Sequence, residues 1–365
     1  MKNSIYLPGI VPMKDVEKYK TSQAATNFNR NIISTGYFSQ VISIPPIIVD
    51  GRFKSHYDTE LGIQYHIIRR HGSSTIGRLL DAIEENIWLI HKILKSTERN
   101  VWYYNIDPVG ALSFEFLRLF TNKRVFVLLA DFNPSRNKGI KGKIIMHCLK
   151  KANGILSLSA RCKGINKNQR IIPGIIKANK ITRKCDEFHN NRTFLLSGYL
   201  NNNNGLQMAL EVFKEVHNAT LYLSGVIAPG LNAIVDSYTS KYPNIIYKGY
   251  YSNYEDYLEL LHSCDFVLSL SDLAQPVNQY NFPSKILEAL SFGKIVVSAN
   301  TFEELEGINY IKCDYTKQSI MECVGSLISG NRMTEIRKCQ SNAEAILNKY
   351  TEHVWIQTFE TLESQ

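Results

Sequence analysis

Short runs of β-branched and aromatic residues alternate with longer amphipathic segments along the 365-residue chain. This alternation is typical of β-α-β units, in which helices connect parallel strands and cover the sheet. The strands predicted in the first half are "SIYLPG", "VISIPPIIV", "IQYHII", "VWYYNI", "VFVLLAD" and "GILSLS". Those predicted in the second half are "TFLLSG", "ATLYLSG", "NIIYKG", "DFVLSLS" and "KIVVSA". The pattern therefore predicts an α/β protein with two mostly parallel sheets.

A polar, basic and weakly periodic segment separates the two groups of strands, which indicates a domain boundary. The chain is also longer than one hydrophobic core usually supports. We expect a first domain over residues 1–175, a linker over 176–192 and a second domain over 193–345. Residues 346–365 are expected to form a helix that packs back on the first domain. Two Rossmann-like domains of this kind bind ligands at the carboxyl ends of their strands.

The composition excludes several classes of protein. Hydrophobic residues make up 44% of the chain and charged residues 21%, as in soluble globular proteins. No apolar run reaches the roughly 20 residues of a membrane-spanning helix, and no signal-peptide core is evident. The seven cysteines and nine histidines show no metal-ligand spacing, so reduced thiols in a cytoplasmic protein are the simplest account. No acidic pair suited to metal coordination is evident either, so we expect neither a metal nor another cofactor.

The net charge of +9 is unevenly distributed. Between Phe132 and Cys185 there is no acidic residue, whereas fourteen Lys and Arg residues fall there. Such a basic block either binds phosphates, an anionic membrane surface or an acidic polymer, or is only solvated. No nucleic-acid-binding module accompanies the charge, so nucleic acid is not an expected partner.

One predicted helix in this block, "GIKGKIIMHCLKK", is amphipathic. Its apolar stripe is expected to face inward and consists of Ile140, Ile144 and Cys148. Its basic face consists of Lys143, His147, Lys150 and Lys151. This basic face suits an anionic membrane surface or a lipid diphosphate, and a merely solvated face is the alternative.

Another helix is predicted to begin at Pro283 within "NQYNFPSKILEALSFGKIVVS". Its first backbone N–H groups lack partners and carry partial positive charge, which suits an anion. Lys285 adds a full charge there, as a diphosphate would require. Glu288 lies on the same face and can accept hydrogen bonds from a ribose 2′,3′-diol. The alternative is an exposed Lys–Glu pair without a ligand.

Three further segments have weaker signals. In "LLSGYLNNNNGLQMALEVF", Gly198 and Gly205 at the two ends of a loop allow the backbone to approach a phosphate. Asp131 follows a predicted buried strand, where it either orients a ligand hydroxyl or caps the next turn, "NPSRN". "GSSTIGRL" has P-loop glycine spacing but lacks the lysine and the hydroxyl. Capping of a helix by Ser73 or Ser74 therefore explains it better.

The order of these motifs from about residue 193 to 300 resembles the GT-B glycosyltransferases, in particular the retaining family 4. After the strand–Gly–loop–Gly–helix segment come "LYLSG", "NIIYKGYYSNYEDYLELLHSCDFVLSLS" and "FPSKILEALSFGKIVVS", whose "FPSK" is typical of one subgroup. The first half matches more loosely, through "LLADFNP" and "RIIPGI". The resemblance implies two Rossmann-like domains facing each other across a cleft. It also implies a UDP- or GDP-linked sugar in the second domain and a glycan or lipid-linked acceptor in the first.

The resemblance also implies roles for individual residues. Glu288 corresponds to the glutamate that binds the donor ribose, and Lys285 faces the diphosphate. The nucleobase would lie against Gly249, Tyr250, Tyr251 and Ser252, and the sugar would be bordered by Gln279, Asn281 and Phe282. The remaining predicted donor residues are Gly198, Tyr199, Asn204, Gly205 and Ser284. The predicted catalytic residues are Lys285, Glu288 and Asp131.

Three positions depart from the family pattern. Many members have a second glutamate eight residues before the first, where this chain has Tyr280. Tyr199 and Asn204 stand where an arginine and a lysine are common. Lys285 therefore becomes the main cation for the leaving diphosphate. In the family's usual mechanism this diphosphate takes the acceptor proton itself, so no protein nucleophile is expected.

We therefore expect a retaining glycosyltransferase of cell-surface polysaccharide biosynthesis, such as that of O-antigen or capsule. It would be cytoplasmic and peripheral on the inner face of the plasma membrane. One alternative is a non-catalytic nucleotide-sugar-binding subunit of a partner transferase, which the three departures favour. Another is a sugar-nucleotide epimerase on the same fold, although no acid/base pair can be assigned to it.

Overall fold

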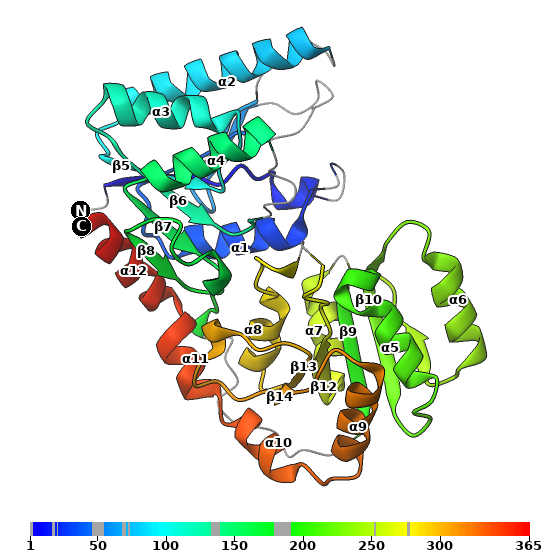
Figure 1. Cartoon of the computed structure of the whole chain (residues 1–365). Coiled ribbons are helices and arrows are strands. Elements are labelled where there is room, and N and C mark those ends of the chain that lie inside the picture. Colours follow the sequence, from blue (N-terminus) through cyan, green and yellow to red (C-terminus); the bar gives the residue numbers. More distant parts are fainter. Residues whose placement is uncertain are drawn as a thin grey trace. The chain divides into compact units, whose positions relative to one another are not determined.

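The computed structural model describes residues 3–16, 19, 21–45, 55–67, 71, 74–132, 139–178, 191–251, 253–275 and 278–365. The chain divides into two compact units (Figure 1). Unit 1 comprises Met1–Ile175 and Glu352–Gln365, and unit 2 comprises Ile176–Thr351. Most of the expected linker, residues 179–190, lies outside the described residues. The return to unit 1 begins at Glu352 rather than at residue 346.

Unit 1 is built on an eight-stranded sheet with the order β3-β4-β2-β1-β5-β6-β7-β8. All neighbouring strands are parallel except β3 and β4. The strands are β1 (Ser4–Leu7), β2 (Gln40–Ser43), β3 (His56–Asp58), β4 (Ile63–Tyr65), β5 (Asn100–Tyr104), β6 (Arg124–Leu129), β7 (Gly154–Ser157) and β8 (Gln169–Ile171). The sequence of β6 is a continuous apolar run because helices cover both faces of the sheet.

The helices of unit 1 form one layer on each face of this sheet. They are α1 (Gln23–Ser34), α2 (Thr75–Leu94), α3 (Gly110–Phe120), α4 (Gly139–Lys151) and α12 (Glu352–Ser364), with short 3₁₀ helices at Met13–Asp15 and Ala160–Cys162. In Figure 1, α2, α3 and α4 cover one face, and α1 and α12 cover the other. The Ser74 side chain accepts a hydrogen bond from the Gly77 N–H at 3.0 Å, which confirms that this residue caps α2.

The C-terminal helix α12 is held in unit 1 by its own polar and aromatic side chains. Glu363 accepts hydrogen bonds from the side chains of Ser4, Tyr37, Asn100 and Trp102 at 2.7–2.8 Å. Trp355 and Phe359 are fully buried in the same helix and pack among the aromatic residues of unit 1. The expected packing of the C-terminal helix on the first domain is therefore confirmed.

Helix α4 is oriented differently from the sequence expectation. Ile140 and Ile144 are exposed, at 77% and 36%, whereas Gly142, Ile145, Cys148 and Leu149 are buried. The predicted inward stripe is thus wrong at two of its three positions. Adjacent isoleucines at 144 and 145 leave the inward face ambiguous in sequence, and contacts with α3 and the sheet decide it. The basic face remains exposed and consists of Lys143, His147, Lys150 and Lys151.

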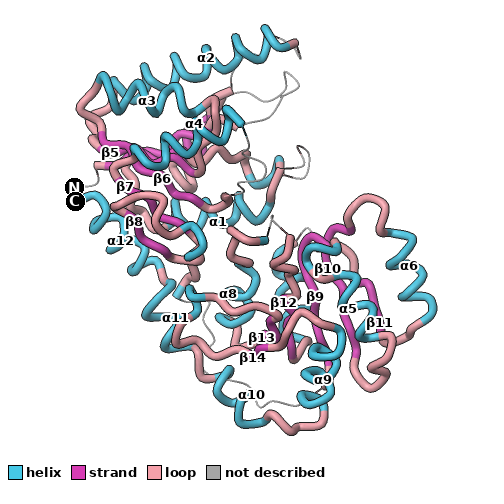
Figure 2. Tube along the Cα trace, in the orientation of Figure 1, coloured by secondary structure: helices cyan, strands magenta, loops and turns pink. Residues whose placement is uncertain are grey.

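Unit 2 is a Rossmann-like domain with a wholly parallel six-stranded sheet, in the order β11-β10-β9-β12-β13-β14 (Figure 2). The strands are β9 (Thr193–Leu200), β10 (Thr220–Ile227), β11 (Ile245–Tyr247), β12 (Phe266–Ser269), β13 (Ile295–Ser298) and β14 (Ile311–Lys312). Its helices are α5 (Leu206–Phe213), α6 (Asn232–Lys241), α7 (Tyr254–Ser263), α8 (Ser284–Ser291), α9 (Lys317–Ile328), α10 (Met333–Gln340) and α11 (Ala343–Tyr350). Short 3₁₀ helices lie at Asn202–Asn204 and Glu303–Leu305.

The strand order of unit 2 reverses between β9 and β12. From β9 the chain proceeds outward to β10 and β11, then returns to place β12 on the other side of β9. Loops that follow strands on either side of such a reversal diverge and leave a ligand-binding crevice. The segments after β9 and β12 are therefore the first place to seek a site in this unit. None of the described helices is long and apolar enough to cross a membrane.

Candidate functional site

Helix α8 presents its amino end on the β12 side of the strand reversal. It begins at Ser284 after Pro283, and no described side chain caps it. Phe282 is buried against Phe302, with ring centroids 5.4 Å apart, and this contact anchors the chain entering the helix. Ser284 itself is exposed. The first N–H groups of α8 are therefore placed to bind an anion.

Lys285 extends from this end of α8 toward the end of β9. Its ammonium donates a hydrogen bond to the Ser197 hydroxyl at 3.3 Å and lies 4.7 Å from the ring centroid of Tyr257. Within the described part of the chain, no carboxylate pairs with it within 4.0 Å. Burial lowers the pKa of Lys285, and the nearby charge of Glu288 opposes that shift. This partly buried cation has weak partners, which an anionic ligand can replace.

Glu288 lies one turn further along α8 and contacts α7. Its Oε1 accepts a hydrogen bond from the Tyr254 hydroxyl at 2.8 Å. Burial raises the pKa of Tyr254 and of Tyr257, and the Glu288 charge raises both further, so both hydroxyls remain protonated donors. Lys285 and Glu288 are each partly buried and engaged with α7 or β9. They do not form the exposed surface pair that was the alternative.

Two glycines bring the ends of β9 and β10 close together beside Lys285. Gly198 has a φ of 118°, and a Cβ there would lie 3.2 Å from Lys285 Cε. Gly225, its partner on β10, has a φ of 134°, and a Cβ there would overlap the Gly198 carbonyl oxygen. Any larger residue at Gly225 would therefore push apart the strands that support Lys285.

The loop after β9 is fastened to the segment after β12. Asn203 accepts hydrogen bonds from the Asp272 N–H at 2.9 Å and from the Asn278 side chain at 2.6 Å. The Asn204 amide donates to the Tyr199 carbonyl at 2.9 Å, while the Tyr199 side chain is exposed. The contacts of Asn203 join the two sides of the strand reversal. The Asn204 side chain is engaged in a hydrogen bond within its own loop.

The other predicted donor residues also follow strands of unit 2. Gly205 packs against Leu270, and the Gly249 carbonyl accepts from the Gly225 N–H at 2.9 Å. The Gln279 amide donates to the Leu273 carbonyl at 3.3 Å. Tyr250 is exposed, Tyr251 and Asn281 are partly buried, and Ser252 lies outside the described residues. The structure thus brings Gly198, Lys285 and Glu288 into one cluster. Of the other predicted donor residues, Tyr199 lies in β9, Ser284 begins α8, and the rest lie in the segments that follow strands.

Asp131 belongs to unit 1, whereas Lys285 and Glu288 belong to unit 2. Asp131 is exposed after β6, and the backbone N–H groups of Ala130 and Asp131 donate to Asn105 Oδ1 at 2.9 and 3.2 Å. The turn that it was alternatively expected to cap, "NPSRN", lies outside the described residues. In α4, His147 Nε2 lies 3.5 Å from a Glu115 carboxylate oxygen of α3.

Three residues of the cluster were absent from the predicted set: Ser197, Tyr254 and Tyr257. The two tyrosines lie three residues apart and therefore on one face of α7, but tyrosines are common in helices that cover a sheet. Ser197 carries no signal beyond its position before Gly198. Only the packing of α7 against α8 and β9 reveals that these hydroxyls contact Lys285 and Glu288.

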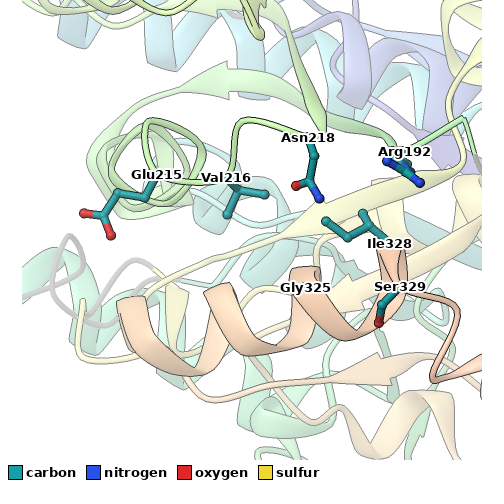
Figure 3. Close-up of a pocket in the computed structure, with 7 residues that line it drawn as sticks. All are labelled: Arg192, Glu215, Val216, Asn218, Gly325, Ile328 and Ser329. Carbon is teal, nitrogen blue, oxygen red and sulfur yellow. The ribbon is translucent and has the colours of Figure 1, made fainter.

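A cavity of about 350 Å³ lies near the amino ends of β9 and β10, away from the segments after the strands that carry Lys285 and Glu288 (Figure 3). It is lined by Arg192, Glu215, Val216, Asn218, Gly325, Ile328 and Ser329. Glu215 forms an ion pair with Lys317 beside it. None of the predicted donor residues lines this cavity. In the described residues, no group of three or more His, Cys, Asp or Glu residues could hold a metal ion.

One family model matches a segment of unit 2. Residues 191–329 match the family model of glycosyl transferases group 1. No curated protein matches the chain. The matched segment lies within unit 2 and includes the cluster around Lys285 and Glu288.

Solved structures resemble the chain over its whole length. Sucrose-phosphate synthase from Thermosynechococcus elongatus matches with 10% identity and a TM-score of 0.74, over 100% of this chain and 98% of that one. Alr3699/HepE from Anabaena, in complex with UDP and glucose, matches with 16% identity and a TM-score of 0.70, over 100% of both chains. A trehalose-6-phosphate synthase studied for glycosyltransfer with retention matches with 8% identity and a TM-score of 0.71, over 100% of this chain and 99% of that one.

These similarities establish that the chain has the two-domain α/β fold of GT-B glycosyltransferases, as predicted. The match of residues 191–329 to glycosyl transferases group 1 bears out the predicted kind of enzyme, a glycosyltransferase.

Proposed function

We propose that the enzyme transfers a sugar from a nucleoside-diphosphate sugar to a glycan or lipid-linked acceptor, with retention of anomeric configuration. One observation carries the proposal. Among the described residues, the partly buried Lys285 ammonium has no carboxylate partner and no side chain caps the amino end of α8, where it lies one turn before Glu288. The "FPSK" segment containing it supports assignment to the family 4 subgroup.

The diphosphate of the donor would bind at the amino end of α8. Lys285 and the first N–H groups of the helix would stabilise the negative charge that develops on the diphosphate as it leaves. The Ser197 hydroxyl and the Tyr257 ring position the ammonium before the ligand arrives. Because these groups are already in place, little reorganisation is needed during the reaction.

The ribose of the donor would bind at Glu288. Tyr254 donates to Oε1 and thereby fixes the orientation of the carboxylate. A carboxylate can accept several hydrogen bonds, so it can still receive two from a ribose diol. Tyr250 and Tyr251 follow β11 and would contact the base. Gln279, Asn281 and Phe282 precede α8 and would border the sugar.

The reaction proposed is a same-face substitution at the anomeric carbon. The acceptor oxygen forms a bond to that carbon while the bond to the diphosphate oxygen breaks. The acceptor proton passes to the departing diphosphate, which leaves as nucleoside diphosphate. Asp131 would orient the acceptor hydroxyl. The similarity to the trehalose-6-phosphate synthase studied for retention supports this stereochemistry, and the similarity to the UDP complex of Alr3699/HepE supports a UDP-linked donor.

The acceptor is proposed to be an intermediate of cell-surface polysaccharide synthesis on a lipid diphosphate. Four exposed basic side chains of α4 favour an anionic ligand or surface: Lys143, His147, Lys150 and Lys151. We place the enzyme in the cytoplasm, peripheral on the inner face of the plasma membrane.

A donor panel tests the proposal. Purified enzyme is incubated with UDP- and GDP-linked hexoses and N-acetylhexosamines, and release of nucleoside diphosphate is followed. We expect slow hydrolysis of at least one donor. NMR should show that the sugar is released with retained configuration, and Glu288→Ala should abolish the hydrolysis. Lack of hydrolysis and of transfer with every donor would contradict the proposed activity.

A further inference from the structure

Helix α2 exposes an apolar stripe along its full length. Ile76, Leu79, Leu80, Ile83, Ile87 and Leu94 have exposed fractions between 40% and 73%. Their spacing places them on one side of the helix, over about 27 Å. The opposite side buries Leu89 and Ile93 in unit 1. The orientation is therefore set by packing, and the outward side is left apolar.

Neighbouring helices extend this stripe into an apolar band. The exposed members on α3 are Leu112, Phe116, Leu119 and Phe120, and those on α4 are Ile140 and Ile144. Helices α2, α3 and α4 lie side by side in one layer (Figure 1). The other side of that layer covers the sheet, so the exposed side chains share its outer face. Soluble proteins rarely keep so many large apolar side chains together on one surface unless something covers them.

The charges beside the apolar band indicate what covers it. Exposed lysines on α4 lie next to it, at positions 141, 143, 150 and 151. Of the nearby acids, Glu115 pairs with Arg118, and Asp81 is buried and hydrogen-bonded to His71. A second copy docked about a two-fold axis would bring the same lysines toward one another. Apolar side chains flanked by cations instead match an anionic lipid surface.

We propose that the apolar band inserts into the headgroup and acyl-chain boundary of an anionic bilayer, with the α4 lysines against the lipid headgroups. The helices would lie in the membrane plane without crossing it. The inference rests on the proposed function in one respect: a lipid-linked acceptor would lie in the membrane to which the enzyme docks. The docking itself depends only on unit 1.

Vesicle flotation tests the docking. The full chain is mixed with phosphatidylcholine vesicles that contain or lack 30% phosphatidylglycerol. We expect Ile87→Ser to lower the partition coefficient about tenfold and the triple variant I76S/I83S/I87S by more than 100-fold. Tyr57→Ser is the matched control, because Tyr57 is 62% exposed and Ile87 63% exposed in the same unit, but Tyr57 lies on β3 outside the band. It should float like the wild type.

A second set of variants separates insertion from charge attraction. Replacing the four α4 lysines with glutamine should weaken flotation with the anionic vesicles at least tenfold and leave flotation with neutral vesicles unchanged. The matched control K241Q/K338Q changes exposed lysines of unit 2 and should have no effect. In the wild type, hydrogen exchange over residues 75–94 and 110–120 should slow when anionic vesicles are added. This measurement does not depend on whether any variant folds.

Flotation of the triple variant like the wild type would overturn the proposal. A second pair of results would also overturn it: the wild type sediments as a dimer that Ile87→Ser dissociates, and the wild type does not float with vesicles. The apolar band would then join two copies of the chain. Donor hydrolysis is measured separately without vesicles, and the triple variant should hydrolyse donor at the wild-type rate. A failure of docking and a failure of the proposed transfer are therefore distinguishable.

Discussion

Replacing Lys285 with methionine should weaken nucleotide binding without destabilising the free protein. Met keeps most of the side-chain length and removes the charge. The free protein loses the hydrogen bond to Ser197 and the contact with the Tyr257 ring, together worth about 1–3 kcal/mol. The variant also avoids burying an ammonium that has no carboxylate partner among the described residues, a cost of several kcal/mol. We therefore expect the free energy of unfolding to stay the same or rise by roughly 1 kcal/mol.

The effect on stability should depend on pH in a defined direction. The pKa of Lys285 is lowered in the folded protein, so the unfolded chain binds more protons between that lowered pKa and the ordinary value of 10.5. The burial cost is present in full below this window and disappears as pH rises through it. Wild-type stability should therefore rise relative to Lys285→Met as pH approaches 10.5.

Nucleotide affinity should fall at the same time. A charged hydrogen bond to the diphosphate is worth about 1.5–3 kcal/mol, or roughly 10- to 150-fold in the dissociation constant measured by calorimetry. Lys294→Met is the matched control, because Lys294 donates to the His262 and Cys264 carbonyls at 2.7 and 2.9 Å. It should lower stability and leave nucleotide affinity unchanged. If Lys285→Met behaves like this control, Lys285 is structural and the reasoning fails.

Two further predictions concern the framework. Gly225→Ala should lower the thermal midpoint and also weaken nucleotide binding, because the added Cβ overlaps the Gly198 carbonyl and displaces the strand end beside Lys285. An unchanged thermal midpoint would show that the close approach of Gly225 to the Gly198 carbonyl is not rigid. Glu363→Ala should lower the free energy of unfolding by about 3 kcal/mol in a denaturant titration, because four donors of unit 1 lose their acceptor. Glu363→Gln should lower the free energy of unfolding by less than Glu363→Ala does. Equal losses in the two variants would show that the charge of Glu363 accounts for the loss.

Strands and loop glycines could be predicted because they depend on local pattern. The apolar runs of β6, β9 and β13 and the start of α8 after Pro283 follow from spacing and backbone preference alone. Lys285 and Glu288 could be singled out because a charged residue at a helix start is unusual on an otherwise apolar helix.

Contacts between elements could not be predicted in the same way. The choice between Ile144 and Ile145 as the buried residue of α4 depends on how the helix rotates against its neighbours. The outward stripe of α2 was missed because a sequence shows which side of a helix is apolar, not which way that side faces. Ser197, Tyr254 and Tyr257 join the cluster through packing between segments far apart in the chain.

The central claim is that α8 holds the diphosphate and ribose of a nucleotide donor. The most direct measurement is calorimetric titration of wild type and Glu288→Ala with the best-binding nucleoside diphosphate and with its 2′-deoxy analogue. We predict that the wild type prefers the ribonucleotide by at least about tenfold, as expected for loss of a charged hydrogen bond, and that the variant binds the two alike. Undiminished discrimination in Glu288→Ala, or no nucleotide binding by the wild type, would contradict the account.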